Sequence, residues 1–309
     1  METELVLRTD ALCKSYKGVR VVDHVNMNVH KGDIYGFVGE NGAGKTTILR
    51  LVSGLAIPDS GTYSLFGVER KDFAAANLFG KVGGIIEVPS IYRSFSALEN
   101  LKMQCVLTGI SKTDAELAAI LERVGLDVKA IGKKRAGSFS LGMRQRLGIA
   151  MSLAADPELL LLDEPMNGLD PQGFHDMREL ILKLHEQGVT FIISSHILSE
   201  LEKIATRVGF ISHGNLLEEI TMAELREKSR KRIAISAEDI ASIAETLKEE
   251  FKLQEFKLEG ESLFISDEID VNDVMNVLVS KKIRIDTIAV NEESMEDYYR
   301  HLIVGGQGK

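Results

Sequence analysis

The stretch GENGAGKTT, residues 39–47, decides the fold of this chain. It fits the pattern G-x-x-x-x-G-K-[ST], in which glycines allow backbone N–H groups to turn toward phosphate oxygens. The preceding run DIYGFV, 33–38, predicts a short buried strand, and the following ILRLVSGL predicts a helix that ends before Pro58. A glycine loop between a strand and a helix N-terminus predicts a site for nucleotide phosphates rather than an ordinary turn.

The side chains of this loop also suit a nucleotide and a magnesium ion. We expect the Lys45 ammonium to reach the β- and γ-phosphates and the Thr46 hydroxyl to bind Mg²⁺. The loop residues expected to line the site are Gly39, Glu40, Asn41, Gly42, Ala43, Gly44, Lys45, Thr46 and Thr47.

A second apolar run, ELLLLDEP at 158–165, predicts a central parallel strand that ends in two acids. We expect Asp163 to hold Mg²⁺, directly or through water, and Glu164 to polarise a water that attacks the γ-phosphate. The alternative is that the two acids only mark where the strand reaches solvent. The phosphate loop upstream favours the catalytic interpretation.

A third run, VTFIISS at 189–195, predicts a strand that is followed by His196. Most histidines are surface or satisfied core residues, but ligands bind at the carboxyl edge of parallel sheets. We therefore expect His196 to hydrogen-bond the γ-phosphate and to hold the water and Glu164 in line.

The stretch SFSLGMRQR, 138–146, precedes a predicted helix with one apolar face. Ser140 is placed to cap that helix, and this role alone would explain the residue. The alternative is a second helix N-terminus that is presented to a phosphate. The residues by themselves leave both interpretations open.

Composition excludes several functional classes. The 309 residues carry a formal charge of -9, which argues against a broad nucleic-acid-binding surface and predicts no nucleic-acid partner. Cys13 and Cys105 lie far apart without metal-type spacing, which indicates a reducing compartment. No signal peptide is expected, and no apolar run reaches the 18 residues typical of a membrane span. Any role at a membrane therefore requires a partner.

The order GENGAGKTT, SLGMRQR, LLLLDEP, NGLD and SSH resembles the ATP-binding cassette (ABC) ATPase family, over roughly residues 4–220. The resemblance implies that ATP is the nucleotide and that two such domains enclose two ATP molecules head to tail. It also implies that Ser140 and Gly142 contact the γ-phosphate bound by a second subunit. The signature here is SLGM where SGGQ is common, so Leu141 and Met143 depart from the usual form.

The same resemblance assigns further residues. It implies that Lys45, Glu164 and His196 are catalytic. It places Tyr16 against adenine, although a tyrosine that simply packs before a turn is an alternative. Asp170 in NGLD matches the loop that crosses the dimer interface, and it is also a candidate N-cap before Pro171. Because the chain has one phosphate loop and one signature, a complete site implies a second ATPase domain, most simply another copy of this chain.

Glu87, in GIIEVPS at 84–90, is a lone acid after an apolar run, and such an acid is usually a solvated turn residue. ABC ATPases commonly have glutamine there. The bacitracin-resistance and lantibiotic-immunity exporters resemble this chain more closely, in IEVP, FSLGM and ISSHILSE. This resemblance implies that Glu87 approaches Mg²⁺ and relays the nucleotide state to a permease.

The predicted fold class is α/β: an ABC-type P-loop ATPase core with a parallel sheet, an antiparallel β-subdomain and a helical subdomain, followed by a small α+β domain. We expect the ATPase domain over 1–222, with its helical subdomain at about 88–157. The tail, 223–309, alternates as β-α-β-β-α-β, which predicts a ferredoxin-like module that either stabilises a dimer or regulates it.

The resemblance therefore implies the ATP-hydrolysing subunit of an exporter for bacitracin-like or lantibiotic peptides. Its expected partners are a second copy and an integral-membrane permease, and its expected place is cytoplasmic, peripheral on the inner face of the cell membrane. An exporter for another substrate and a soluble regulatory ABC ATPase are the alternatives.

Overall fold

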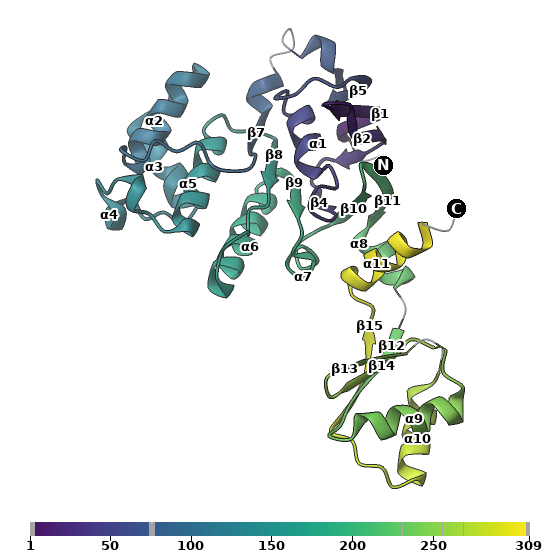
Figure 1. The fold of residues 1–309 in the computed structure, drawn as a ribbon. Helices are drawn as coiled ribbons and strands as arrows, with labels where there is room; N and C mark the ends of the chain where they lie inside the picture. Colours follow the sequence, from purple (N-terminus) through teal and green to yellow (C-terminus); the bar gives the residue numbers. More distant parts are fainter. Residues whose placement is uncertain (1–3, 74–77, 230, 255, 268, 307–309) are drawn as a thin grey trace. The chain divides into compact units, whose positions relative to one another are not determined.

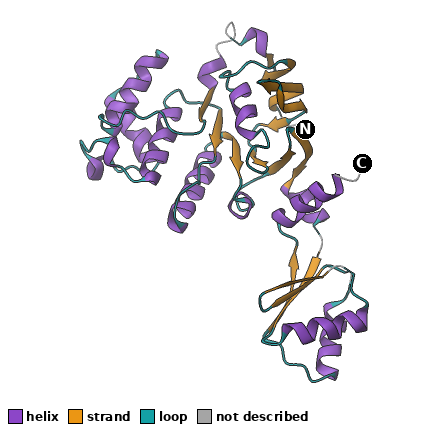
Figure 2. Cartoon of the chain, in the orientation of Figure 1, coloured by secondary structure: helices purple, strands orange, loops and turns teal. Residues whose placement is uncertain are grey.

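The computed structural model describes residues 4–73, 78–229, 231–254, 256–267 and 269–306 (Figure 1). Contacts divide the chain into two units, Met1–Met222 and Ala223–Lys309. Both units contain helices and strands (Figure 2).

A six-stranded sheet forms the centre of the first unit, in the order β11-β10-β4-β9-β8-β7. The pairs from β10 to β7 are parallel, and β11 runs antiparallel to β10. Every residue of β4, β8 and β9 is buried, which explains their continuous apolar sequences. The strands are β4 (Ile34–Val38), β7 (Val82–Ile85), β8 (Leu159–Asp163), β9 (Thr190–Ser195), β10 (Arg207–Ser212) and β11 (Asn215–Thr221).

A second, antiparallel sheet is built from the N-terminal strands, in the order β2-β1-β5-β6 with β3 paired to β1. One apolar core is shared by this sheet, the central sheet and α1 (Lys45–Val52), and it includes Tyr63, Phe37 and Ile48. This shared core fixes the helix that follows the phosphate loop. The strands are β1 (Leu5–Tyr16), β2 (Val19–Val25), β3 (Asn28–His30), β5 (Ser60–Leu65) and β6 (Val68–Glu69).

The helices between β7 and β8 gather on one side of the first unit, away from the antiparallel sheet (Figure 1). Capping boxes begin two of them, Ser96 with Glu99 and Thr113 with Glu116. The helices of this unit are α2 (Ala97–Thr108), α3 (Asp114–Arg123), α4 (Val128–Ile131), α5 (Leu141–Leu153), α6 (Pro171–Glu186) and α7 (Leu198–Leu201), and short 3-10 turns occupy Arg70–Asp72, Leu78–Lys81 and Ala136–Ser138.

The second unit is a four-stranded antiparallel sheet with helices packed on one face. Its strand order, β13-β14-β12-β15, and its β-α-β-β-α-β connectivity are those of a ferredoxin-like module. Leu247, Leu263 and Val274 lie in its core. The elements are α8 (Met222–Lys228), β12 (Lys231–Ser236), α9 (Ile240–Phe251), β13 (Phe256–Glu259), β14 (Ser262–Ile265), α10 (Val271–Ser280), β15 (Thr287–Glu292) and α11 (Met295–Gly306).

None of the helices within the described ranges combines the length and apolarity that crossing a membrane requires.

Replacement of Leu247 by alanine is expected to destabilise the second unit by about 2–5 kcal/mol, because a fully buried leucine leaves a cavity. Val279→Ala is the control, because Val279 is 72% exposed, and its effect should stay within about 0.5 kcal/mol. Hydrogen exchange of the amides in β12 and β14 of the full chain measures both. Equal protection in the two variants would contradict the assigned core.

Candidate functional site

The phosphate loop lies between β4 and α1, and its glycines are required by space and by conformation. Gly42 and Gly44 have φ of 83° and 109°, which residues with a Cβ rarely adopt. A Cβ at Gly39 would lie 2.5 Å from the Ile211 carbonyl oxygen, and one at Gly44 would lie 2.6 Å from that of Val21. The loop can therefore keep this path only with glycine at these positions.

Lys45 is folded back into the loop. Its Nζ donates to the carbonyl oxygens of Gly39, at 2.5 Å, and Glu40, at 3.3 Å, and lies 3.6 Å from Glu164 Oε1. The lysine is only 6% exposed. A pocket beside it is lined by Val21, residues 40–47 and Glu164. The ammonium thus lies against both the loop and the end of β8.

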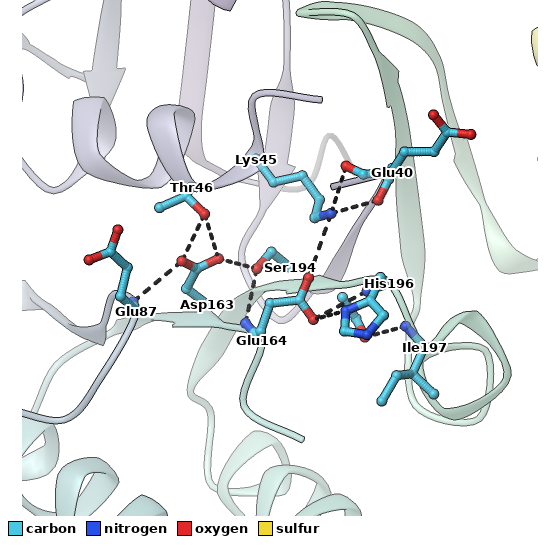
Figure 3. A network of polar contacts seen from close by, with 11 residues as sticks. Glu40, Lys45, Thr46, Glu87, Asp163, Glu164, Ser194, His196 and Ile197 are labelled. Atoms are coloured by element: carbon cyan, nitrogen blue, oxygen red, sulfur yellow. Dashed lines mark hydrogen bonds and ion pairs between the residues drawn. The ribbon is translucent and has the colours of Figure 1, made fainter. Parts of the chain in front are cut away.

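Thr46 and Asp163 form the metal-type part of the site (Figure 3). The Thr46 hydroxyl lies 2.9 and 3.2 Å from the two carboxylate oxygens of Asp163. Asp163 is 5% exposed, so its oxygens are held in place. A hydroxyl and a carboxylate are hard oxygen donors, and this donor set fits Mg²⁺.

Ser194, near the end of β9, is a site residue that the sequence analysis missed. Its hydroxyl donates to Asp163 Oδ1 and accepts from the Glu164 backbone N–H at 3.0 Å. It therefore holds both acids in place. The signal was present in the sequence, since Ser194 is the penultimate residue of the same run, 189–195, that precedes His196.

Glu164 connects Lys45 to His196. Its Oε2 lies 2.7 Å from His196 Nδ1 and accepts from the His196 backbone N–H at 3.3 Å, while Oε1 faces Lys45. Glu164 has a φ of 49°, which turns its side chain out of the strand direction. The three expected catalytic residues therefore meet at the carboxyl edge of the sheet (Figure 3).

Glu87 reaches this centre with its backbone rather than its side chain. Its N–H donates to Asp163 Oδ2 at 3.3 Å. Its carboxylate is 57% exposed and forms an ion pair with Arg50 of α1 at 2.5 Å, pointing away from Thr46 and Asp163 (Figure 3). The structure therefore brings Thr46 and Asp163 together and leaves the Glu87 carboxylate outside their contact.

Ser140, Gly142 and Asp170 line a different pocket of the same unit, which shares no residue with the pocket at the phosphate loop. Ser140 caps α5 by accepting from the Met143 N–H at 3.2 Å, and Asp170 caps α6 by accepting from the Gly173 N–H at 2.8 Å. The capping roles are therefore present. The three residues share one pocket, and none of them lines the pocket at the phosphate loop.

Tyr16 ends β1 and is 42% exposed, and it does not line the pocket at the phosphate loop. Lys14 Nζ lies 5.4 Å from the centre of its ring and forms an ion pair with Asp59 at 2.8 Å. The hydrogen bond from Lys14 holds the pKa of the Asp59 carboxyl below its usual value, together with that from the Ser15 N–H. An exposed ring held at the end of a strand is suited to stacking.

Comparison with known proteins places these features in a family. Residues 22–167 match the family described as ABC transporter. Over 304 residues the chain is 41% identical to the bacitracin transport ATP-binding protein BcrA of Bacillus licheniformis, covering 97% of this chain and 98% of BcrA. Over 216 residues it is 43% identical to the lantibiotic transport ATP-binding protein SrtF of Streptococcus pyogenes, covering 69% of this chain and 90% of SrtF.

A solved structure has the same fold. The ATP-binding cassette MJ0796, in a dimeric post-hydrolysis state bound to ADP and Pi, superposes with a TM-score of 0.63 at 22% identity, covering 70% of this chain and 98% of that chain. The predicted ABC-type ATPase fold is confirmed by this match and by the family match. With identity to BcrA extending over nearly the whole chain, this protein belongs to the family of ABC transporter ATP-binding proteins.

Proposed function

We propose that this chain is the ATP-hydrolysing subunit of an ABC exporter that confers resistance or immunity to bacitracin-like or lantibiotic peptides. The convergence of Lys45, Glu164 and His196 at one sheet edge carries the hydrolytic part of the proposal. The peptide substrate rests on the similarity to the bacitracin transport protein BcrA and the lantibiotic transport protein SrtF, the first of which matches over 98% of its length.

In the proposed reaction, water attacks the γ-phosphorus and the bond to the β–γ bridging oxygen breaks. Glu164 orients this water and accepts its proton, because its carboxylate is fixed at both oxygens. His196 holds Glu164 through Nδ1 and is positioned to contact the γ-phosphate. Lys45 balances the negative charge that develops on the phosphate oxygens. Glu164 already lies in contact with both Lys45 and His196, whereas the Lys45 ammonium has to leave the Gly39 and Glu40 carbonyls to reach the phosphates.

Thr46 and Asp163 are the residues proposed to hold Mg²⁺, which would neutralise charge on the β- and γ-phosphate oxygens. Ser194 keeps the Asp163 carboxylate oriented toward Thr46. Glu87 belongs to the same proposal as a further oxygen donor and as a relay to the permease. Its carboxylate has to leave Arg50 before it can take that role.

The ATP site is proposed to be shared between two copies of the chain. One copy contributes the phosphate loop, with Tyr16 stacked on adenine, and the other contributes Ser140, Gly142 and Asp170. The separation of these groups into two pockets within one chain supports this arrangement. So does the dimeric state of the MJ0796 cassette. A C2 pair would complete two sites at once.

The remaining partner in the proposal is an integral-membrane permease, which would place the subunit on the inner face of the cell membrane. Co-purification with a multi-spanning membrane protein would support this placement. Isolation without any membrane protein, together with association with ribosomes or DNA, would favour a soluble regulatory ATPase instead.

Glu164→Gln is expected to lower ATP hydrolysis by about 10²–10⁴-fold, because the amide cannot accept a proton from water. ATP binding should remain near the parental level, since the loop is unchanged. Phosphate release and binding of a fluorescent ATP analogue measure the two effects. Glu186→Gln, at an exposed glutamate that ends α6, is the control and should hydrolyse ATP at the parental rate. Unchanged hydrolysis in Glu164→Gln would exclude its assigned role.

Two inactive variants are expected to restore activity when mixed, if each ATP site is shared. Lys45→Ala damages the loop half, and Gly142→Asp places a negative charge in the other half. A Cβ at Gly142 meets only Leu169, at 3.7 Å, so the aspartate fits the fold. The mixed dimer contains one intact site, and phosphate release should recover measurably.

The control for this mixing experiment is Lys45→Ala with Glu164→Gln. Both changes lie in the same half-site, so every site in that mixed dimer is damaged and activity should stay absent. Equal recovery in the two mixtures, or none in either, would contradict a site built from two chains.

Deletion of the gene is expected to sensitise cells to bacitracin or to a lantibiotic. The parent should restore resistance, whereas Glu164→Gln should not, because transport requires hydrolysis. Minimum inhibitory concentrations across both peptide classes, with an unrelated membrane-active compound as control, measure this. Unchanged sensitivity to every peptide would favour an exporter for another substrate.

A further inference from the structure

The pairing of β1 with β2 contains a bulge. Leu12 pairs with Val25 and Lys14 pairs with Val22, so that Asp23 and His24 both lie opposite Cys13. His24 has a φ of 49°, in the left-handed region that few histidines occupy. Bulges of this kind redirect side chains. Here two neighbouring residues of one strand, which would otherwise point to opposite faces, are turned toward the same cysteine.

The bulge gathers three different ligand types. One ligand atom from each of Cys13, Asp23 and His24 lies within 4.8 Å of the others. The Cys13 sulfur accepts from the His24 backbone N–H at 3.3 Å, and His24 Nδ1 lies 2.7 Å from Asp23 Oδ1. Cys13 is buried, while the side chain of His24 is 66% exposed. The cluster is therefore open to solvent on the histidine side.

A thiolate, an imidazole and a carboxylate together match the preferences of zinc. Three protein ligands leave a fourth tetrahedral position for water. Magnesium and calcium select oxygen donors instead, so this set is poorly suited to them. Its chemistry differs from that of Thr46 and Asp163, and none of its three residues lines the pocket at the phosphate loop.

We propose that Cys13, Asp23 and His24 form a binding site for a borderline-soft divalent cation of the zinc type. The site goes beyond the proposed ATPase function, which requires no such ion.

Arg20 occupies part of this site as a competing cation. Its Nη1 lies 2.8 Å from Asp23 Oδ1 and 4.0 Å from the Cys13 sulfur. The Arg20 side chain is 50% exposed and can move into solvent. Because guanidinium and metal would share the same anionic groups, removal of Arg20 should strengthen metal binding.

The alternative is a purely structural network that anchors the bulge. The Asp23 N–H donates to the Gly214 carbonyl at 2.9 Å, and the Gly214 N–H donates to the Ala43 carbonyl in the phosphate loop at 3.0 Å. Such an anchor needs no metal. Under this alternative Cys13, Asp23 and His24 would affect stability, and Arg20 would have no effect on metal affinity.

Titration of the full chain with Co²⁺, in a non-thiol reductant, tests the proposal because a thiolate-to-cobalt charge-transfer band reports a Cys–metal bond. The parent should show the band, and Zn²⁺ should remove it. Cys13→Ser should lose the band, whereas Cys105→Ser should keep it and is the matched control, since these are the two cysteines of the chain. An oxygen-only site cannot produce this band.

The other ligands give graded effects. His24→Gln and Asp23→Asn should each weaken Co²⁺ binding by at least about tenfold. Even the loss of a residue that only hydrogen-bonds to a metal ligand lowers metal affinity by about tenfold or more. Arg20→Ala should tighten it. If Cys13→Ser fails to fold, His24→Gln still tests the site, because the exposed His24 side chain can be replaced without disturbing the core. Thermal unfolding without metal shows whether each variant is folded.

No band in the parent, a band that survives Cys13→Ser, or a band that His24→Gln leaves unchanged would overturn the site. Unchanged or weaker binding in Arg20→Ala would contradict the competition assigned to Arg20.

Discussion

The contact between Thr46 and Asp163 is the interaction on which the rest of the site depends, because it joins the helix after the phosphate loop to another strand of the sheet. The phosphate loop follows β4 and Asp163 ends β8, and these two strands are not neighbours, since β9 lies between them. Ser194 of β9 pairs in register with Phe37 of β4 and with Asp163 of β8, and its hydroxyl donates a hydrogen bond to Asp163 Oδ1. A register shift by one residue would turn Ser194 away from Asp163. Three adjacent strands therefore fix one metal-type centre.

Two acids beside this centre adopt left-handed backbone conformations, Glu164 with φ 49° and Glu87 with φ 67°. Such conformations cost roughly 1–2 kcal/mol for a residue with a side chain. Both are held by hydrogen bonds from their backbone N–H groups, to Ser194 and to Asp163 respectively. The strain is stored at the ends of neighbouring strands, β8 and β7, and its effect is to direct the two carboxylates differently. Glu164 turns to Lys45 and His196, and Glu87 turns to Arg50.

Much of this arrangement could be predicted from sequence because it depends on short patterns. Buried strands are continuous apolar runs in the sequence, and the residue after each run lies at the same sheet edge, where the structure places Glu164 in contact with Lys45 and His196. Ser194 was missed because its role depends on strand order, which one run does not reveal. The direction of the Glu87 side chain was also beyond prediction, since Arg50 stabilises it from a helix distant in sequence. The bulge opposite Cys13 could not be predicted from the sequence either, because register shifts have no simple sequence pattern.

The helix N-termini of α1 and α5 support the proposal that two copies of the chain share each ATP site. Both helix N-termini carry a positive dipole end, so both favour an anion. Within one chain they belong to separate pockets. In the proposed dimer, a phosphate bound at α1 of one copy would contact α5 of the other. The nucleotide would then stabilise the paired state more than the separated one, and this difference in free energy is what the proposed transporter would convert into movement. Hydrolysis would remove the shared phosphate and with it the interaction that keeps the two copies closed.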